Sequence, residues 1–302
     1  MQHVSASQAA GPVAHAPVAP GPDANSPVTY VGVSTKMYLG YRDSLNWLAQ
    51  LKHEVDSRPA LAAGRVVPFV IPSFPVLPAA AALVGDSPLV LGAQNCGWAD
   101  GPWTGEVAPS MLAELGVRLV EIGHAERRAH FGENDAVVAL KVRAADDAGL
   151  TPLLCVGEDC VGEDSVGEDS IGEAAADEDT AGEAAAGGAA AAADFVYRQI
   201  EAAVSGDWTL ASRLIIAYEP VWAIGAAEPA DAVYVSDVVN HLRARLAAHG
   251  LQELPVIYGG SAKPGLLPKL GGVSGLFLGR FAHDAANFGK VLDEALLIAF
   301  SL

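Results

Sequence analysis

The stretch Leu214-Ile215-Ile216-Ala217-Tyr218-Glu219-Pro220 starts as an apolar run and ends with one carboxylate followed by a proline. An apolar run of this length is typical of a buried parallel strand. Pro220 fixes its own φ and restricts the residue before it, so the strand stops with Glu219 held in one orientation. The apolar loop from Val221 to Gly225 can fold over whatever the carboxylate attacks. This pattern favours a general base over the alternative, a surface glutamate in a salt bridge.

Short apolar runs that alternate with amphipathic segments indicate the fold class. The runs predicted to be strands are Thr29–Thr35, Val66–Ile71, Leu89–Gln94, Leu119–Gly123, Pro152–Val156, Leu214–Tyr218, Pro255–Tyr258 and Gly275–Gly279. The predicted helices include Ser44–Val55, Ala136–Ala148, Ser236–Ala248 and Asp284–Ile298. Alternation repeated eight times, with strands apolar throughout, favours an α/β fold of the closed parallel (β/α)8 barrel type. A doubly wound open sheet is the alternative, but no Gly-x-Gly-x-x-Gly follows the first strand.

Composition and charge argue against nucleic-acid and membrane partners. The chain is 51% hydrophobic, yet no apolar stretch reaches the length of a membrane span. The net charge is −18, and no basic patch offsets this field. Residues 1–27 are rich in Ala and Pro and lack a basic leader, so we expect a disordered tail and not a signal peptide. Cys96, Cys155 and Cys160 form no even framework and no CxxC pair, which favours a cytoplasmic location and no metal site.

The segment at about 158–193 does not fit a compact barrel. From Val156 it repeats Val-Gly-Glu-Asp at five-residue intervals, and it continues into an acidic stretch and an Ala/Gly tract. A regular Asp/Glu repeat can indicate calcium binding, but the spacings of an EF-hand and of a calcium β-roll are absent. We therefore expect a low-complexity acidic insertion within a barrel domain of residues 28–302. Only Glu158, in the first copy of the repeat, abuts a strand and can belong to a site.

Motifs at the strand ends resemble those of the triosephosphate isomerase family and occur in that family's order. They are Lys36-Met37, Gly92-Ala-Gln-Asn-Cys96, Trp103-Thr-Gly-Glu106, Gly123-His124-Ala125-Glu126-Arg127-Arg128, Cys155-Val-Gly-Glu158, Tyr218-Glu219-Pro220-Val221-Trp222-Ala223-Ile224-Gly225 and Tyr258-Gly259-Gly260-Ser261. The resemblance covers roughly Thr29 to Leu302. It implies a TIM barrel that acts as an aldose–ketose isomerase on a small sugar phosphate, without a cofactor or a metal.

The resemblance also implies a role for each catalytic residue. Moving a carbonyl along a sugar phosphate needs a base that shifts a proton between adjacent carbons and an electrophile that stabilises the enediolate. Glu219 would be the base, and a neutral His124 at the start of a helix would donate to the carbonyl oxygen, the pairing known from triosephosphate isomerase itself. Lys36 would supply a fixed cation, and Glu126 would be the carboxylate neighbour that holds Lys36. The alternatives are a core histidine satisfied by the backbone and a solvated lysine.

The substrate phosphate would lie on backbone N–H groups at the loops after the last strands, the usual phosphate site of such barrels. These groups belong to Gly225, Ser261 and Gly279, and the Ser261 hydroxyl is a further donor. Gly259 and Gly260 would let the backbone approach the phosphate closely.

Four segments depart from the family pattern. Ser34 replaces an Asn, Ala125 a Ser, Arg280 a second Gly, and Ala226-Ala227-Glu228 the lid hinge Thr-Gly-Lys. The base, the electrophile and the lysine are kept, while residues at the two ends of the substrate change. This predicts altered substrate length with preserved chemistry, and we expect a four-carbon erythrulose phosphate. A true triosephosphate isomerase is the alternative, and a non-catalytic barrel that acts as a binding protein is a more distant one.

The resemblance further implies a homodimer. The loop from Gly97 to Glu106 matches the family's long third loop, which inserts into the partner subunit. It is rich in Gly and Trp and has too few apolar residues to pack alone. Thr104 would then approach the first strand of the partner.

Overall fold

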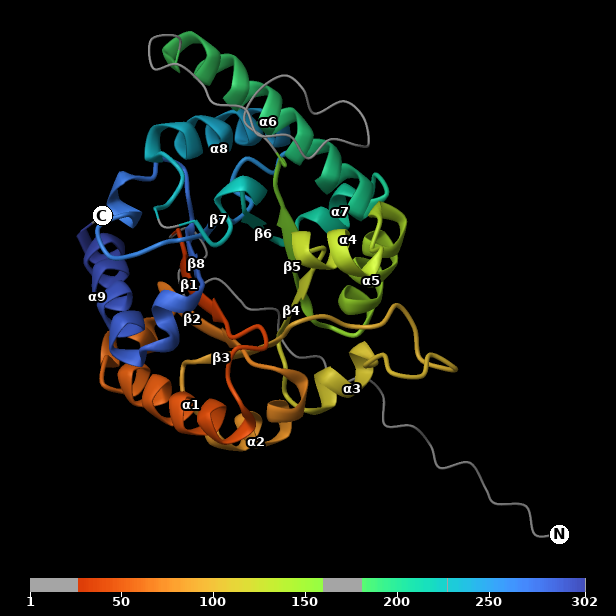
Figure 1. Ribbon diagram of the computed structural model, residues 1–302, viewed down its shortest axis with the longest axis vertical. Helices are drawn as coiled ribbons and strands as arrows, with labels where there is room; N and C mark the ends of the chain where they lie inside the picture. The colour runs from red at the N-terminus through yellow and green to blue at the C-terminus, as the bar shows by residue number, and fades with distance from the viewer. Residues whose placement is uncertain (1–26, 160–180, 227, 302) are drawn as a thin grey trace, which may run out of the picture.

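The computed structural model describes residues 27–159, 181–226 and 228–301, and eight parallel strands in these residues close into a barrel (Figure 1). Each strand pairs with its neighbours in chain order, and the first strand also pairs with the last. The strands are β1 (Thr29–Ser34), β2 (Val66–Ile71), β3 (Val90–Ala93), β4 (Leu119–Ile122), β5 (Thr151–Val156), β6 (Ile215–Tyr218), β7 (Val256–Gly260) and β8 (Gly275–Leu278). The predicted barrel is confirmed, because an open sheet would leave its edge strands unpaired.

Helices surround the barrel and connect successive strands (Figure 1). They are α1 (Tyr41–Asp56), α2 (Leu77–Val84), α3 (Pro109–Glu114), α4 (Ala125–Phe131), α5 (Asp135–Asp147), α6 (Ala181–Val204), α7 (Trp208–Ala211), α8 (Ala232–Leu246) and α9 (Ala285–Ser301). Short 3-10 helices add η1 (Pro59–Ala63), η2 (Phe74–Val76), η4 (Val221–Ala223), η5 (Ala247–His249), η6 (Leu267–Lys269) and η7 (Arg280–His283). None of the helices in the described ranges is long and apolar enough to cross a membrane.

The strands are buried on both faces because they separate two apolar layers. Successive side chains of a strand point to opposite faces, so alternate residues fill the barrel interior or pack against the helices. Phe69 and Phe277 meet inside the barrel with ring centroids 5.6 Å apart. A Cβ at Gly32 would lie 1.8 Å from the Phe69 ring, so β1 needs a glycine there to admit the ring. Interior filling of this kind makes the barrel a rigid support for the strand ends.

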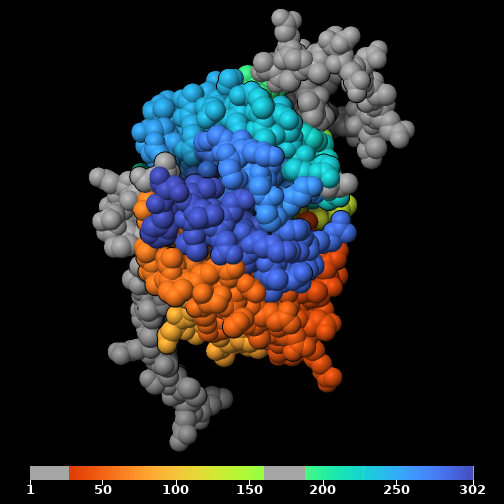
Figure 2. Space-filling view, turned by 90° about the vertical axis from the view of Figure 1, so that its left-hand side faces the viewer, coloured from red at the N-terminus to blue at the C-terminus, as the bar shows by residue number. Residues whose placement is uncertain are grey.

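The ring of helices closes where the two ends of the described chain meet. Figure 2 shows the C-terminal part of the chain, in blue, packed directly on the N-terminal part, in orange. Arg58, which follows α1, forms a two-pronged ion pair with Asp293 of α9, with distances of 2.7 and 2.9 Å. The indole of Trp47 donates to the carbonyl oxygen of Ala282 over 3.0 Å. The first contact joins the end of α1 to α9, and the second fixes the loop after β8, which carries part of the site described below.

The predicted tail and most of the acidic insertion lie outside the described residues. The insertion was expected to reach about residue 193, whereas α6 already begins at Ala181. Ala189, Ala192 and Ala193 of this helix are buried. The end of the Ala/Gly tract is therefore part of the helical ring. Its sequence has no alternation of apolar and polar residues, so periodicity could not identify it as a helix.

Candidate functional site

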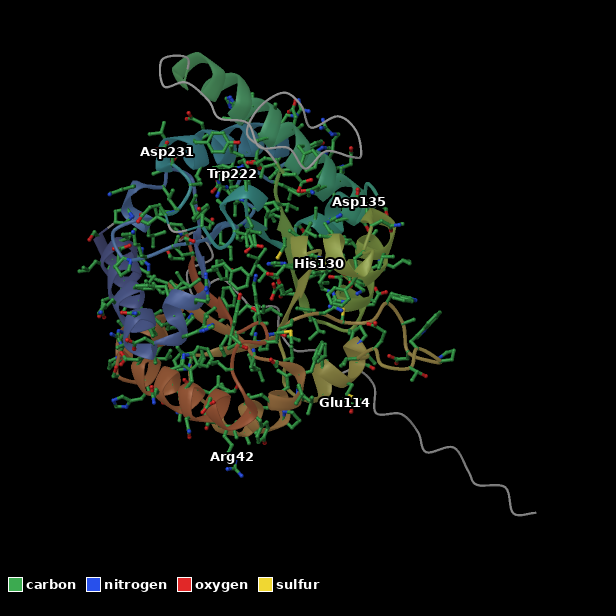
Figure 3. The ribbon with its side chains drawn as sticks, in the orientation of Figure 1. Arg42, Glu114, His130, Asp135, Trp222 and Asp231 are labelled. Carbon is green, nitrogen blue, oxygen red and sulfur yellow. The ribbon has the colours of Figure 1, made fainter. Side chains whose placement is uncertain are left out.

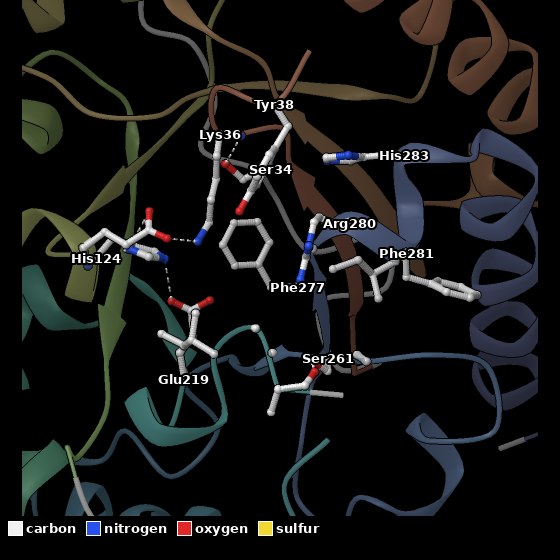
Figure 4. Close-up of a pocket in the computed structure, with 18 of the residues that line it drawn as sticks. Ser34, Lys36, Tyr38, His124, Glu219, Ser261, Phe277, Arg280, Phe281 and His283 are labelled. Carbon is white, nitrogen blue, oxygen red and sulfur yellow. Dashed lines mark hydrogen bonds and ion pairs between the residues drawn. The ribbon is translucent and has the colours of Figure 1, made fainter. Parts of the chain in front are cut away.

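A cavity of about 810 Å³ opens at the carboxyl ends of the strands (Figure 4). Its wall brings together most of the residues that the sequence singled out, from segments far apart in the chain. They are Ser34, Lys36, His124, Glu126, Glu219, Gly225, Gly260, Ser261, Gly279 and Arg280. In Figure 4, Lys36, His124 and Glu219 converge on one side of the cavity, and Ser261 and Arg280 lie on the other. Surface residues such as Arg42 on α1 point away from the barrel (Figure 3).

His124 is oriented by the helix that it begins. It is the N-cap of α4, and its Nδ1 accepts the backbone N–H of Glu126 over 3.0 Å. In a neutral imidazole one ring nitrogen donates and the other accepts, so this bond leaves the hydrogen on Nε2. Nε2 lies 3.6 Å from Oε2 of Glu219. The ring is 4% exposed and therefore presents one donor to the cavity.

Lys36 is held by its backbone and by one carboxylate. Its φ is 45°, a left-handed conformation that is uncommon for a residue with a side chain. Its Nζ donates to Oε1 of Glu126 over 2.5 Å. Burial lowers the pKa of Lys36, but the hydrogen bond and the charge of Glu126 outweigh it, so the pKa lies above its ordinary value. Lys36 thus remains a cation at the cavity wall.

Glu219 is positioned by packing and by the thiol of Cys155, which is a side-chain hydrogen-bond partner of its carboxylate. It follows β6 and is 8% exposed. A Cβ on Gly259 would lie 2.3 Å from its Oε1, so Gly259 leaves the space that the carboxylate fills. Gly259 itself does not line the cavity, whereas Gly260 does. The sequence analysis placed Gly259 at the phosphate. In the structure Gly259 instead packs against the carboxylate of Glu219.

Hydrogen bonds and an ion pair attach the loop after Glu219 to the barrel. Oε1 of the buried Glu158 accepts from the Trp222 indole over 3.1 Å, and from Tyr218 and Tyr234. Burial raises the pKa of Glu158, and these hydrogen bonds oppose the increase. The hydroxyl of Ser261 donates to the carbonyl oxygen of Ala226. Further along, Lys263 pairs with Glu228 over 2.7 Å. The labelled Trp222 marks this loop in Figure 3.

The opposite side of the cavity offers backbone donors and one guanidinium. Gly225 has a φ of 75°, which glycine adopts without strain. A Cβ on Gly279 would meet nothing within 4 Å, so this wall is open. Arg280 begins η7, and it is not among the described residues with a positive φ, so its backbone tolerates a side chain. Its guanidinium lies 5.9 Å from the centroid of the Tyr38 ring.

A buried acidic residue of the cavity was missed by the sequence analysis. Glu121 of β4 lines the cavity and is 4% exposed. Burial raises its pKa to about 7, His124 and Lys36 lower it, and Glu219 raises it further. The sequence could have identified it, because Glu121 is the one charged residue in the eight predicted strands.

The comparisons with known proteins agree on one family. The model of the triosephosphate isomerase family matches residues 29–295. Among similar proteins, the L-erythrulose-1-phosphate isomerase of Pectobacterium atrosepticum is 43% identical, over 89% of this chain and 96% of that protein. The proteins of the same name from Rhizobium etli and Mycolicibacterium smegmatis are 38% and 37% identical, over 88% of this chain and 91% and 92% of their own. The crystal structure of triosephosphate isomerase from Bartonella henselae matches with a TM-score of 0.67 at 26% identity, over 91% of this chain and 99% of that one.

Proposed function

The chain belongs to the triosephosphate isomerase family and is a sugar-phosphate isomerase, and we propose that its substrate is L-erythrulose 1-phosphate. Support for the four-carbon substrate comes from the names of its relatives, which are 37–43% identical. The departures at Ser34 and Arg280 agree with it, because both residues line the cavity. Dihydroxyacetone phosphate is the alternative substrate, favoured by the family match itself.

The reaction needs one proton shift between carbons and one between oxygens. In a 1-phosphorylated ketose the carbonyl is on C2, and we assign Glu219 to take the proton from C3. His124 Nε2 would donate to the C2 oxygen while the enediolate forms, and Lys36 would stabilise its charge. Glu219 then returns the proton to C2, and the hydroxyl hydrogen of the C3 oxygen passes to the C2 oxygen.

The fourth carbon decides what this proton shift produces. In a three-carbon substrate C3 carries two hydrogens, so the new carbonyl is an aldehyde. In erythrulose 1-phosphate C3 carries one hydrogen and a hydroxymethyl group, so the same transfers leave a ketone at C3. Counted from the other end, that product is erythrulose 4-phosphate. The site must therefore accommodate a hydroxymethyl group next to the reacting carbon.

One observation carries the mechanism: Nε2 of His124 and Oε2 of Glu219 lie 3.6 Å apart in the wall of a cavity that also holds Lys36. The phosphate would bind the backbone N–H groups of Gly225, Ser261 and Gly279. Since the Ser261 hydroxyl already donates to Ala226, we assign its backbone N–H to the phosphate.

The test is an isomerase assay on purified protein with L-erythrulose 1-phosphate and dihydroxyacetone phosphate in parallel, with products identified by NMR. We expect the higher kcat/KM for the four-carbon substrate. High efficiency with dihydroxyacetone phosphate and no turnover of erythrulose phosphate would establish the alternative. No turnover of either substrate would favour the non-catalytic barrel.

We further propose that the active form is a cytoplasmic homodimer. The loop 97–106 projects from the barrel beyond β3 (Figure 1). Trp98 and Trp103 meet there with centroids 5.0 Å apart, and Trp103 is 42% exposed. An exposed tryptophan on a projecting loop is a suitable anchor for a partner subunit. Cys96 and Cys155 are free thiols, which supports a reducing compartment.

A further inference from the structure

Glu121 is a charged residue placed inside the barrel. On β4, Val120 and Ile122 belong to the layer between strands and helices, and Leu119 belongs to the interior layer. Because side chains alternate along a strand, Glu121 lies on the same face as Leu119, one step nearer the carboxyl end. It is thus the floor of the cavity that holds the proposed catalytic groups.

The carboxyl group of Glu121 is only partly satisfied by the protein. The Ser34 hydroxyl is its side-chain hydrogen-bond partner. Oε2 is buried and has no hydrogen-bond partner among the described residues. His124, Glu219 and Lys36 line the same cavity, so Glu121 shares the site of the reacting groups.

A carboxyl group in this position lowers the stability of the barrel. The interior layer of the barrel is largely apolar and includes Ile71, Leu119, Ala217 and Phe277. Burying a polar group without its full set of hydrogen bonds costs free energy, so an apolar residue would fill this place at less cost. Because Glu121 also lines the cavity, a ligand atom there can become the partner of Oε2.

The two ends of the cavity determine which part of the substrate meets Glu121. With the phosphate at the loops of Ser261 and Gly279, the reacting carbons lie at His124 and Glu219. The chain of the substrate continues from there away from the phosphate, toward the side where Ser34 and Lys36 lie (Figure 4). Glu121 lines that side of the cavity, and it engages Ser34.

Building on the proposed function, we propose that Glu121 binds the hydroxyl of the terminal hydroxymethyl group of the four-carbon substrate and thereby selects substrate length. Ser34 orients one oxygen of the carboxyl group, and the other accepts the substrate hydroxyl. A three-carbon substrate has no atom at this place and leaves Oε2 unpaired. A site built to pair a hydroxyl discriminates strongly against an analogue that lacks it.

The test compares Glu121→Val and Glu121→Gln with the unmodified enzyme. For each, kcat/KM is measured with L-erythrulose 1-phosphate and with dihydroxyacetone phosphate, and the ratio of the two values is the readout. We expect the ratio to fall at least ~10-fold in Glu121→Val, because one substrate hydroxyl loses its partner. Glu121→Gln keeps an amide oxygen as acceptor, so in this variant the ratio should fall less. Leu119→Val, on the same face of β4 but deeper in the barrel, is the matched control and should leave the ratio unchanged.

Each other outcome has a distinct meaning. An unchanged ratio in Glu121→Val overturns the inference and leaves the proposed function intact. An equal loss with both substrates also overturns it, because Glu121 would then only position His124 and Glu219. Absence of four-carbon turnover in the unmodified enzyme overturns the proposed function, and the inference falls with it. If Glu121→Val does not fold, Glu121→Met carries the same comparison, because it has similar length and no oxygen acceptor, and an unchanged ratio in this variant counts against the inference.

Discussion

Gly259 and Glu219 share one space: a Cβ on Gly259 would lie 2.3 Å from Oε1 of the carboxylate and 2.4 Å from its Cγ. The glutamate side chain is flexible and Gly259 has no positive φ, so the added methyl group would displace the carboxylate and not the backbone. We expect Gly259→Ala to keep the fold and to lower kcat by about 10- to 100-fold, since a displacement of about 1 Å is enough for such a loss.

Gly40→Ala is the matched control for this substitution. Gly40 has extended backbone angles, and its Cβ would meet the nearest atom at 3.6 Å. Its kcat and melting temperature should equal those of the unmodified protein. If Gly259→Ala also retains full kcat, packing against position 259 does not fix the base.

The second prediction tests the base directly. Glu219→Gln preserves shape and burial but removes the group that accepts the proton. We expect turnover to fall by roughly 10²–10⁴, typical for loss of a positioned general base, with an unchanged circular dichroism spectrum. Turnover close to that of the unmodified enzyme would show that Glu219 is not the general base.

The features of the molecule that the sequence predicted rest on patterns and motifs that are each short and local in the chain. Alternation of apolar runs with amphipathic segments predicted the barrel, and the strand-end motifs predicted Lys36, His124 and Glu219 as neighbours. Their convergence follows from topology, because parallel strands in a barrel bring all their carboxyl ends to one face.

The missed features depend on register and packing. Glu121 was overlooked because the run Leu119–Gly123 was classed as an apolar strand. A charged residue among apolar neighbours in a buried strand costs free energy, and this cost indicates a functional role. The contact of Gly259 with Glu219 joins β7 to the end of β6, and which of two adjacent glycines faces the carboxylate depends on strand register. The start of α6 was not predicted because the Ala/Gly tract there has no periodic pattern of apolar and polar residues.

The third prediction concerns stability and pH. The pKa of Glu121 is raised by burial to about 7, against an ordinary value of 4.5. Between these values the folded protein keeps a proton that the unfolded chain releases, so rising pH favours unfolding. Stability should therefore decrease as the pH rises from about 4.5 to 7, by roughly 3 kcal/mol at most from this group.

The measurement is denaturant unfolding between pH 4.5 and 8 for the unmodified protein and for Glu121→Gln. The variant has no carboxyl group at this position, so its stability relative to the unmodified protein should increase across the window. A difference that stays constant with pH would mean that Glu121 does not titrate there.

The fourth prediction concerns the homodimer. Trp103→Ala removes the exposed ring of the projecting loop, and we expect the dimer dissociation constant to rise at least ~10-fold, as for a central aromatic anchor. Analytical ultracentrifugation over a concentration series measures this constant. Leu297→Ala is the control, because Leu297 is 71% exposed on α9, on the side of the barrel opposite the loop in Figure 1. A fully active monomer at micromolar concentration would contradict the dimer.

The last prediction concerns a double variant that should restore a preference for the three-carbon substrate. Ser34→Asn adds volume where the terminal hydroxymethyl group would lie, and it removes the hydroxyl that holds Glu121. Arg280→Gly removes the guanidinium from the wall to which we assign the phosphate. An unpaired buried hydroxyl costs about 1–3 kcal/mol, or roughly 5- to 150-fold in kcat/KM. We therefore expect the double variant to shift the ratio of kcat/KM values toward dihydroxyacetone phosphate by a factor in that range.

The single variants separate the two contributions. Ser34→Asn should account for most of the shift in the ratio, because Ser34 and Glu121 lie on the side of the extra carbon. Arg280→Gly should change KM for both substrates together, because both carry the phosphate that faces this wall. If Arg280→Gly alone changed the ratio while Ser34→Asn did not, the fourth carbon would lie at the rim of the cavity, and the substrate would bind in the opposite direction from the one proposed.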